Sequence, residues 1–115
     1  MGWPTKSYKK SNRKKKDGYV YIISNTAFDG WYKLGVTHNI ESRLRTYQTS
    51  SPYRNYKIEY YIHHPDCYAA ERSIQANLYH FALDRKKEWF RCSLQIVKDR
   101  VDESLTPDEF PLDFF

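Results

Sequence analysis

Four side chains that lie far apart in this chain offer groups suited to cutting a phosphodiester bond. They are the Tyr21 phenol, the Lys33 ammonium, the Arg43 guanidinium and the Glu71 carboxylate. Carboxylate oxygens are favoured ligands of Mg²⁺, and a guanidinium can hold a phosphate through two parallel hydrogen bonds. Together these groups are a plausible inventory for phosphodiester hydrolysis with one divalent metal ion, although no one of them would indicate it alone.

Tyr21 and Lys33 fall in two runs with the composition of β-strands. Residues 18–24 are rich in Tyr, Val and Ile, and residues 31–37 resume this pattern after a stretch of turn-forming residues. The arrangement predicts an antiparallel hairpin. Gly35 in the second run either ends the strand or allows a close approach of the backbone to a substrate.

Arg43 is expected on a short amphipathic helix. Ile40, Leu44 and Tyr47 recur at helical spacing, and Asn39 can cap the exposed amides of the first turn. Arg43 borders this apolar stripe, so its side chain can lean over the hairpin.

Glu71 is expected on a longer helix that follows a third strand. Residues 56–63 alternate between apolar and polar side chains, and Pro65 then interrupts the strand. Asp66 can cap a helix that runs to about Leu83. Glu71 flanks the apolar face of this helix, where a partly buried carboxylate needs a partner or a cation. That apolar face consists of Cys67, Ala70, Ile74, Leu78 and Phe81.

Two histidines, His63 and His64, stand at the end of the third strand. Such a pair can bind a metal ion or titrate near neutral pH. We expect solvated loop side chains instead, because this is the more common role.

Residues 88–92 form a short extended segment. Trp89 and Phe90 within it either stack on bases or, as is more common for such a pair, pack in the core. Lys86 and Lys87 either extend a basic surface beside them or belong to a solvated loop.

A last helix begins after Ser93, which can cap it. The predicted order of elements is therefore strand, strand, helix, strand, helix, extended segment and helix. This order is typical of an α+β fold in which a small, mostly antiparallel, three-stranded sheet is flanked by helices. The apolar face of the last helix consists of Leu94, Val97 and Val101.

The 115 residues predict a single globular domain between an arm and a tail of opposite charge. Residues 1–17 carry seven Lys or Arg side chains and one acid, whereas residues 98–115 carry six acids and two basic side chains. We therefore expect a basic, disordered arm (1–17), a globular domain (18–105) and an acidic, aromatic tail (106–115). The tail either folds back onto the domain or binds a partner protein.

A net charge of +5, concentrated in the arm, suits a polyanion such as DNA. Each phosphate contact releases condensed counterions and so favours binding without reading sequence. The arm could instead be a solvated leader that keeps the protein in solution. The candidate DNA-binding residues are Lys14, Lys15, Lys16, Arg45 and Arg54.

The two cysteines, Cys67 and Cys92, are too few for a disulfide framework or a zinc cluster, which indicates a reducing compartment. No apolar run approaches the ~20 residues that span a bilayer, and the N-terminal residues contain no hydrophobic signal core. We expect an intracellular protein, located in the cytoplasm or nucleoid, or in the nucleus of a eukaryotic cell or host.

The order and spacing of these features resemble the GIY-YIG endonuclease superfamily, in particular its small phage-type branch with a lysine in the second motif. The resemblance extends from about residue 18 to residue 90 and depends on several motifs that arrive in the expected order. The matching segments are Gly18-Tyr19-Val20-Tyr21, Lys33-Leu34-Gly35, Glu41-Ser42-Arg43-Leu44, Ala70-Glu71-Arg72-Ser73-Ile74 and Glu88-Trp89-Phe90.

The resemblance implies a metal-dependent DNA endonuclease with Tyr21, Lys33, Arg43 and Glu71 in its active site. Glu71 would bind one Mg²⁺ or Mn²⁺ ion together with the scissile phosphate and water. Arg43 would hold nonbridging phosphate oxygens, and Tyr21 would orient or deprotonate the attacking water. Lys33 would either lower the pKa of Tyr21 by favouring the phenolate or contact the phosphate directly.

A second interpretation is a catalytically inactive module of the same fold that binds DNA or a protein. It is suggested by Lys33, Tyr47 and Gln75, which stand where members of the superfamily frequently carry other residues.

Overall fold

The computed structural model describes residues 16–105. Lys14, Lys15 and the predicted C-terminal tail lie outside the described residues. The elements follow in the order β1 (Gly18–Asn25), β2 (Trp31–Thr37), α2 (Ile40–Thr49), β3 (Tyr56–His64), α3 (Cys67–Phe81), β4 (Asp84–Lys86), β5 (Trp89–Arg91) and α4 (Leu94–Glu103).

The predicted α+β class is confirmed, but the sheet has five strands instead of three. Their order is β3-β1-β2-β5-β4, and every neighbouring pair is antiparallel. The predicted extended segment is β5, which pairs with both β2 and β4. β4 has the sequence Asp-Arg-Lys, without an alternating pattern or β-branched side chains, so its composition gave no strand signal.

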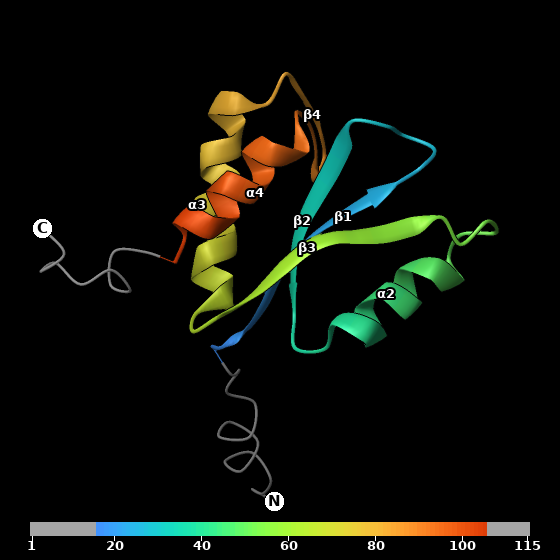
Figure 1. The fold of residues 1–115 in the computed structure, drawn as a ribbon, viewed down its shortest axis with the longest axis horizontal. Helices are drawn as coiled ribbons and strands as arrows, with labels where there is room; N and C mark the ends of the chain where they lie inside the picture. Colours follow the sequence, from blue (N-terminus) through green and yellow to red (C-terminus); the bar gives the residue numbers. More distant parts are fainter. Residues whose placement is uncertain (1–15, 106–115) are drawn as a thin grey trace, which may run out of the picture.

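The two faces of the sheet are covered by different helices. Paired residues of adjacent strands share a face, so the Ile22 and Leu34 pair lies on one side and the Tyr21 and Gly35 pair on the other. α3 and α4 lie on the first side and α2 on the second (Figure 1). The main core is on the α3 and α4 side and comprises Val20, Ile22, Leu34, Cys67, Ala70, Ile74, Leu78, Phe90, Cys92, Val97 and Val101.

The three helices begin where their capping residues predict. The side-chain oxygen of Asn39 accepts a hydrogen bond from the Ser42 amide at 2.8 Å. Asp66 and Ser93 cap α3 and α4 in the same way, and each accepts from the amide three residues later. These side chains replace the missing intrahelical acceptors of the first turn.

The end of α3 differs from the prediction. The helix ends at Phe81, and Ala82 is extended because the chain turns into β4. Phe81 is 47% exposed and lies outside the core, with the Arg100 guanidinium 4.9 Å from its ring centroid. No helix within residues 16–105 has the length and apolar composition needed to cross a membrane.

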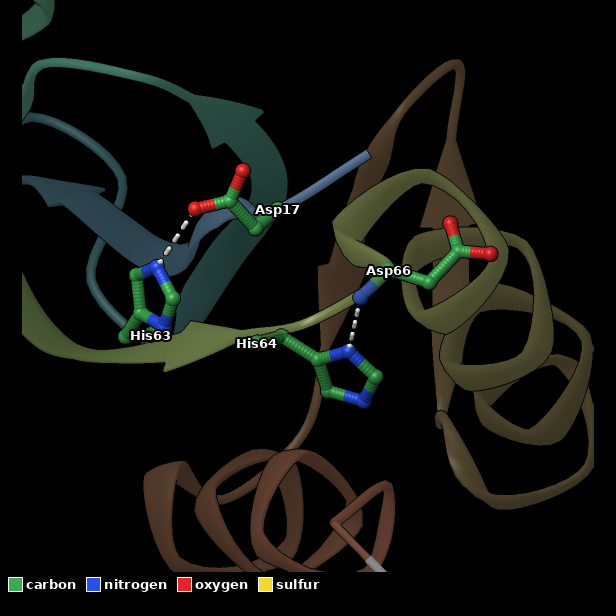
Figure 2. Close-up of polar contacts among 4 residues, drawn as sticks. All are labelled: Asp17, His63, His64 and Asp66. Carbon is green, nitrogen blue, oxygen red and sulfur yellow. Dashed lines mark hydrogen bonds and ion pairs between the residues drawn. The ribbon is translucent and has the colours of Figure 1, made fainter. Parts of the chain in front are cut away.

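The two histidines at the end of β3 have different environments, as Figure 2 shows. His63 Nε2 lies 3.1 Å from a carboxylate oxygen of Asp17, and both side chains are about half exposed. His64 accepts a hydrogen bond at Nδ1 from the Asp66 amide at 2.9 Å, so its Nε2 carries the hydrogen that is donated to the Ser104 carbonyl at 3.0 Å. The prediction of a solvated loop side chain is therefore wrong for His64, which connects the end of β3 to the ends of α3 and α4.

His64→Ala should lower the free energy of unfolding by about 1–3 kcal/mol, because it removes two partly buried hydrogen bonds. His63→Ala is the matched control and should cost less than about 1 kcal/mol, because its pair with Asp17 is exposed. Urea unfolding followed by circular dichroism measures both. Equal losses for the two variants would contradict the bridging role of His64.

Candidate active site

The candidate site is a cleft of about 370 Å³ beside the C-terminal half of β2. β5 pairs with β2 only from Trp31 to Lys33, so the following residues of β2 have no β5 partner. The absence of a strand leaves room for side chains from both helical layers. The cleft is lined by Tyr21, Lys33, Leu34, Gly35, Val36, Arg43, Tyr47, Glu71, Gln75 and Glu88.

The structure brings together the four residues that the sequence indicated as catalytic. β1 provides Tyr21, β2 Lys33, α2 Arg43 and α3 Glu71. The four side chains therefore reach one cleft from four separate elements.

Tyr21 and Gly35 face each other directly across β1 and β2. A Cβ atom on Gly35 would overlap the Tyr21 hydroxyl group and lie 2.5 Å from Cζ of its ring. Only glycine leaves space for the ring at this point. Of the two roles considered for Gly35, close approach is the one seen, but the group that approaches is Tyr21 of the same chain.

The hydroxyl groups of Tyr21 and Tyr47 form a hydrogen bond of 3.3 Å in which either can donate. Tyr21 is only 1% exposed. Burial, followed by the contact with Tyr47, raises the pKa of Tyr21 well above its ordinary value, although Arg43 and Lys33 act in the opposite direction. Lys33 therefore acts on the pKa of Tyr21 in the expected direction, but desolvation outweighs its charge and the net pKa is raised.

Lys33 forms an ion pair with Glu88, with Nζ 3.0 Å from the nearer carboxylate oxygen. The same ammonium lies 5.4 Å from the centroid of the Tyr47 ring. Lys33 thus contacts both the Glu88 carboxylate and the Tyr47 ring, which both line the cleft.

Glu71 is half-buried and takes part in none of the ion pairs or hydrogen bonds found within residues 16–105. Burial raises the pKa of its carboxyl group, and the negative charge of Glu88 raises it further. Lys33 and Arg72 only partly oppose these effects. The ionised carboxylate is therefore under-compensated and would be stabilised by a cation.

Arg43 is exposed at the cleft and is absent from the ion pairs found within residues 16–105, including any with Glu41 on the same helix. Arg45 and Arg54 are also exposed but do not line the cleft. Among residues 16–105, no three His, Cys, Asp or Glu side chains form a ready-made metal cluster.

Sequence reasoning missed two polar contributors to the cleft. The helical spacing puts Tyr47 in an apolar stripe, but its position one helical turn after Arg43 also places both residues on one side of α2. Glu88 belongs to a segment that matches the superfamily, but the sequence does not place it in the cleft, because its position depends on the β4 and β5 hairpin. Gln75, one turn after Glu71, also lines the cleft.

Comparison with known proteins agrees with this arrangement. A model of the T5orf172 domain matches residues 18–104, which is most of the chain. The chain belongs to the T5orf172 domain family. It is also similar to a UPF0213 protein of Bacillus licheniformis, with 32% identity over 73 residues that cover 61% of this chain and 73% of the relative. No solved structure gives a significant match.

The family and this relative place the chain among nuclease-like, DNA-binding domains related to the GIY-YIG type.

Gly35→Ala should lower the free energy of unfolding by about 1–3 kcal/mol, because the new methyl group overlaps Tyr21 in a packed site. In a Tyr21→Leu background the same change should cost much less, since the hydroxyl and the outer ring atoms are gone. A double-mutant cycle from urea unfolding measures this coupling. Additive losses would show that the two residues do not compete for this space.

Glu71→Gln should stabilise the protein at pH 7 and much less at pH 4. A carboxyl group whose pKa is raised on folding holds its proton more tightly in the native state, so stability falls as pH rises from the ordinary glutamate pKa of about 4.3 through the native value. Thermal unfolding of parent and variant across this range measures the difference. Glu41→Gln, at an exposed carboxylate on α2, is the control and should show no comparable gain.

Proposed function

We propose that this chain is a metal-dependent endonuclease that hydrolyses phosphodiester bonds in DNA. The observation that supports it best is one open cleft that holds a guanidinium, an ammonium, two phenols and an under-compensated carboxylate. Membership of a nuclease-like family is consistent with the same chemistry.

The donors present fit a hard divalent cation such as Mg²⁺ or Mn²⁺. Glu71 would hold the ion, and Glu88 adds negative potential at the same place. One strong protein ligand is sufficient where phosphate and water provide the remaining oxygens, because Mg²⁺ retains much of its hydration. When bound, the ion would offset negative charge on the leaving oxygen.

The cationic side chains would grip the phosphate. Arg43 is exposed and has no ion pair within the described range, so its planar fork can take two nonbridging oxygens. Lys33 forms an ion pair with Glu88, which partly neutralises its charge and weakens its attraction for the phosphate. Arg43 is therefore the main contact that should tighten as charge develops on the phosphate.

The two tyrosines would orient the attacking water as neutral phenols. Burial raises the pKa values of both hydroxyl groups, which disfavours a phenolate that could act as a base. Tyr21 is almost fully buried, whereas Tyr47 is partly exposed, so Tyr47 is the hydroxyl that can meet water. Tyr21 would act through Tyr47 as a positioning residue.

A module that binds DNA without cutting it is the alternative. It is favoured by the burial of Tyr21 and by the engagement of Lys33 with Glu88, which together leave Arg43 as the one cationic cleft residue outside an ion pair in the described range. This alternative predicts salt-dependent binding with no turnover. The predicted protein contact through residues 106–115 stays a prediction, because the tail lies outside the described residues.

Arg43→Ala should lower the rate of cleavage about 100-fold or more with Mg²⁺ or Mn²⁺, because it removes a charge that stabilises the transition state. Glu71→Gln should abolish cleavage. Duplex, nicked and branched DNA should be compared, with cleavage followed on denaturing gels. Arg45→Ala is the matched control, since it removes the same charge from the same helix outside the cleft. As a candidate DNA-binding residue, Arg45 should affect only KM, so kcat at saturating DNA should stay near the parent value.

Thermal unfolding with added Mg²⁺ separates the metal site from catalysis. The ion should raise the Tm of the parent and not that of Glu71→Gln, because a ligand stabilises only the state that binds it. DNA binding without cleavage in any metal would instead support the inactive module.

A further inference from the structure

A second hollow, of about 290 Å³, lies on the same side of the sheet as the cleft. It is lined by Phe28, Trp31, Lys86 and Trp89, so three of its four walls are aromatic. The Phe28 and Trp89 rings meet edge to face with centroids 5.1 Å apart. Its volume is at the lower end of small-ligand pockets.

Strand register places this hollow next to the cleft. Trp89 pairs with both Lys33 and Lys86, so all three side chains share one face. Trp31 is two residues before Lys33 on β2 and lies on that face too, about 7 Å along the strand. The cleft and the aromatic hollow therefore lie next to each other along β2.

The neighbouring residues on these short strands face the other way and have a different role. Phe90 is buried in the core, and Arg85, which pairs with it, lies over the Tyr79 ring at 4.3 Å from the centroid. The contrast shows that Trp89 and Lys86 are not required by the core.

The position of Phe28 also indicates a ligand. It lies in the turn between β1 and β2, where polar residues and glycine are the norm, and it is 38% exposed. An aromatic ring kept partly in water costs free energy that a stacked group would recover. Lys86, with Lys87 next to it, supplies positive charge at the rim.

We propose that the hollow formed by Phe28, Trp31, Trp89 and Lys86 binds one unpaired nucleobase next to the phosphate held in the cleft. The base would stack on the aromatic side chains, and Lys86 would contact its phosphate. A paired base cannot enter, because its faces are covered by its neighbours in the duplex. The proposal rests on the proposed function for the identity of the ligand, and it assigns a preference for DNA with an extruded or single-stranded base.

Binding in EDTA tests this without cleavage. Fluorescence anisotropy should show that the parent binds a labelled duplex with one bulged base about tenfold more tightly than the fully paired duplex, in line with stacking on a single base. Phe28→Ala should remove this preference and leave affinity for paired DNA unchanged. Tyr53→Ala is the matched control, because Tyr53 is 81% exposed in a different loop.

A fluorescent base analogue gives a direct readout. 2-Aminopurine at the bulge should be quenched when the parent binds, because it stacks on indole, and much less when Phe28→Ala binds. Equal affinity for the two duplexes, or binding without quenching, would overturn the proposal even if the protein cuts DNA. A dimer in sedimentation that Phe28→Ala dissociates would also overturn it and assign the hollow to a second copy.

The outcomes are distinct from those of the nuclease proposal. Base preference and quenching in a protein that never cleaves would support the aromatic site and reject catalysis. Failure to bind either duplex in EDTA, together with no cleavage in Mg²⁺ or Mn²⁺, would overturn both.

Discussion

The packing of the Tyr21 ring against Gly35 is the constraint on which the candidate site depends. The two residues are opposite each other in β1 and β2, and no side chain larger than hydrogen fits at the second position. The ring is thereby buried in the floor of the cleft, where its hydroxyl meets Tyr47 of α2. One missing Cβ atom thus fixes the relation between the hairpin and the helix that presents Arg43.

The early end of β5 has an equally large effect. A strand that continued along β2 beyond Lys33 would pair with the edge and fill the space now occupied by the cleft. Because it ends there, α2 and α3 can contribute side chains from opposite sides of the sheet. The unpaired edge of β2 therefore allows side chains from the helices on both faces of the sheet to line one site.

The charge in the cleft costs folding stability at Glu71 but is suited to binding a charged ligand. Two carboxylates, Glu71 and Glu88, lie near two cations, but within residues 16–105 only Glu88 of the two forms an ion pair. The Glu71 carboxylate costs stability as it ionises, and burial raises the pKa values of the Tyr21 and Tyr47 hydroxyl groups. Ionisable groups with shifted pKa values are typical of functional sites, where a bound ligand can compensate their charge.

The sequence by itself determined the local elements and indicated the main residues of the candidate site. Alternation and helical spacing located the first three strands and the helices, and Asn39, Asp66 and Ser93 marked where the helices begin. These signals are local, because each depends on residues within a few positions of one another. The motifs containing Tyr21 and Glu71 could be recognised in the sequence because each is also a short, local pattern.

Only the tertiary structure decided the β4 and β5 hairpin, the placement of Glu88 in the cleft, the bridging role of His64 and the exposure of Phe81. It also decided the direction of the net pKa shift at Tyr21, because burial outweighs the lowering effect of Lys33, and desolvation depends on everything that surrounds the phenol and not on one neighbouring charge. Strand pairing and burial depend on groups that are distant in the sequence. A local sequence pattern does not specify which of these groups will pack together.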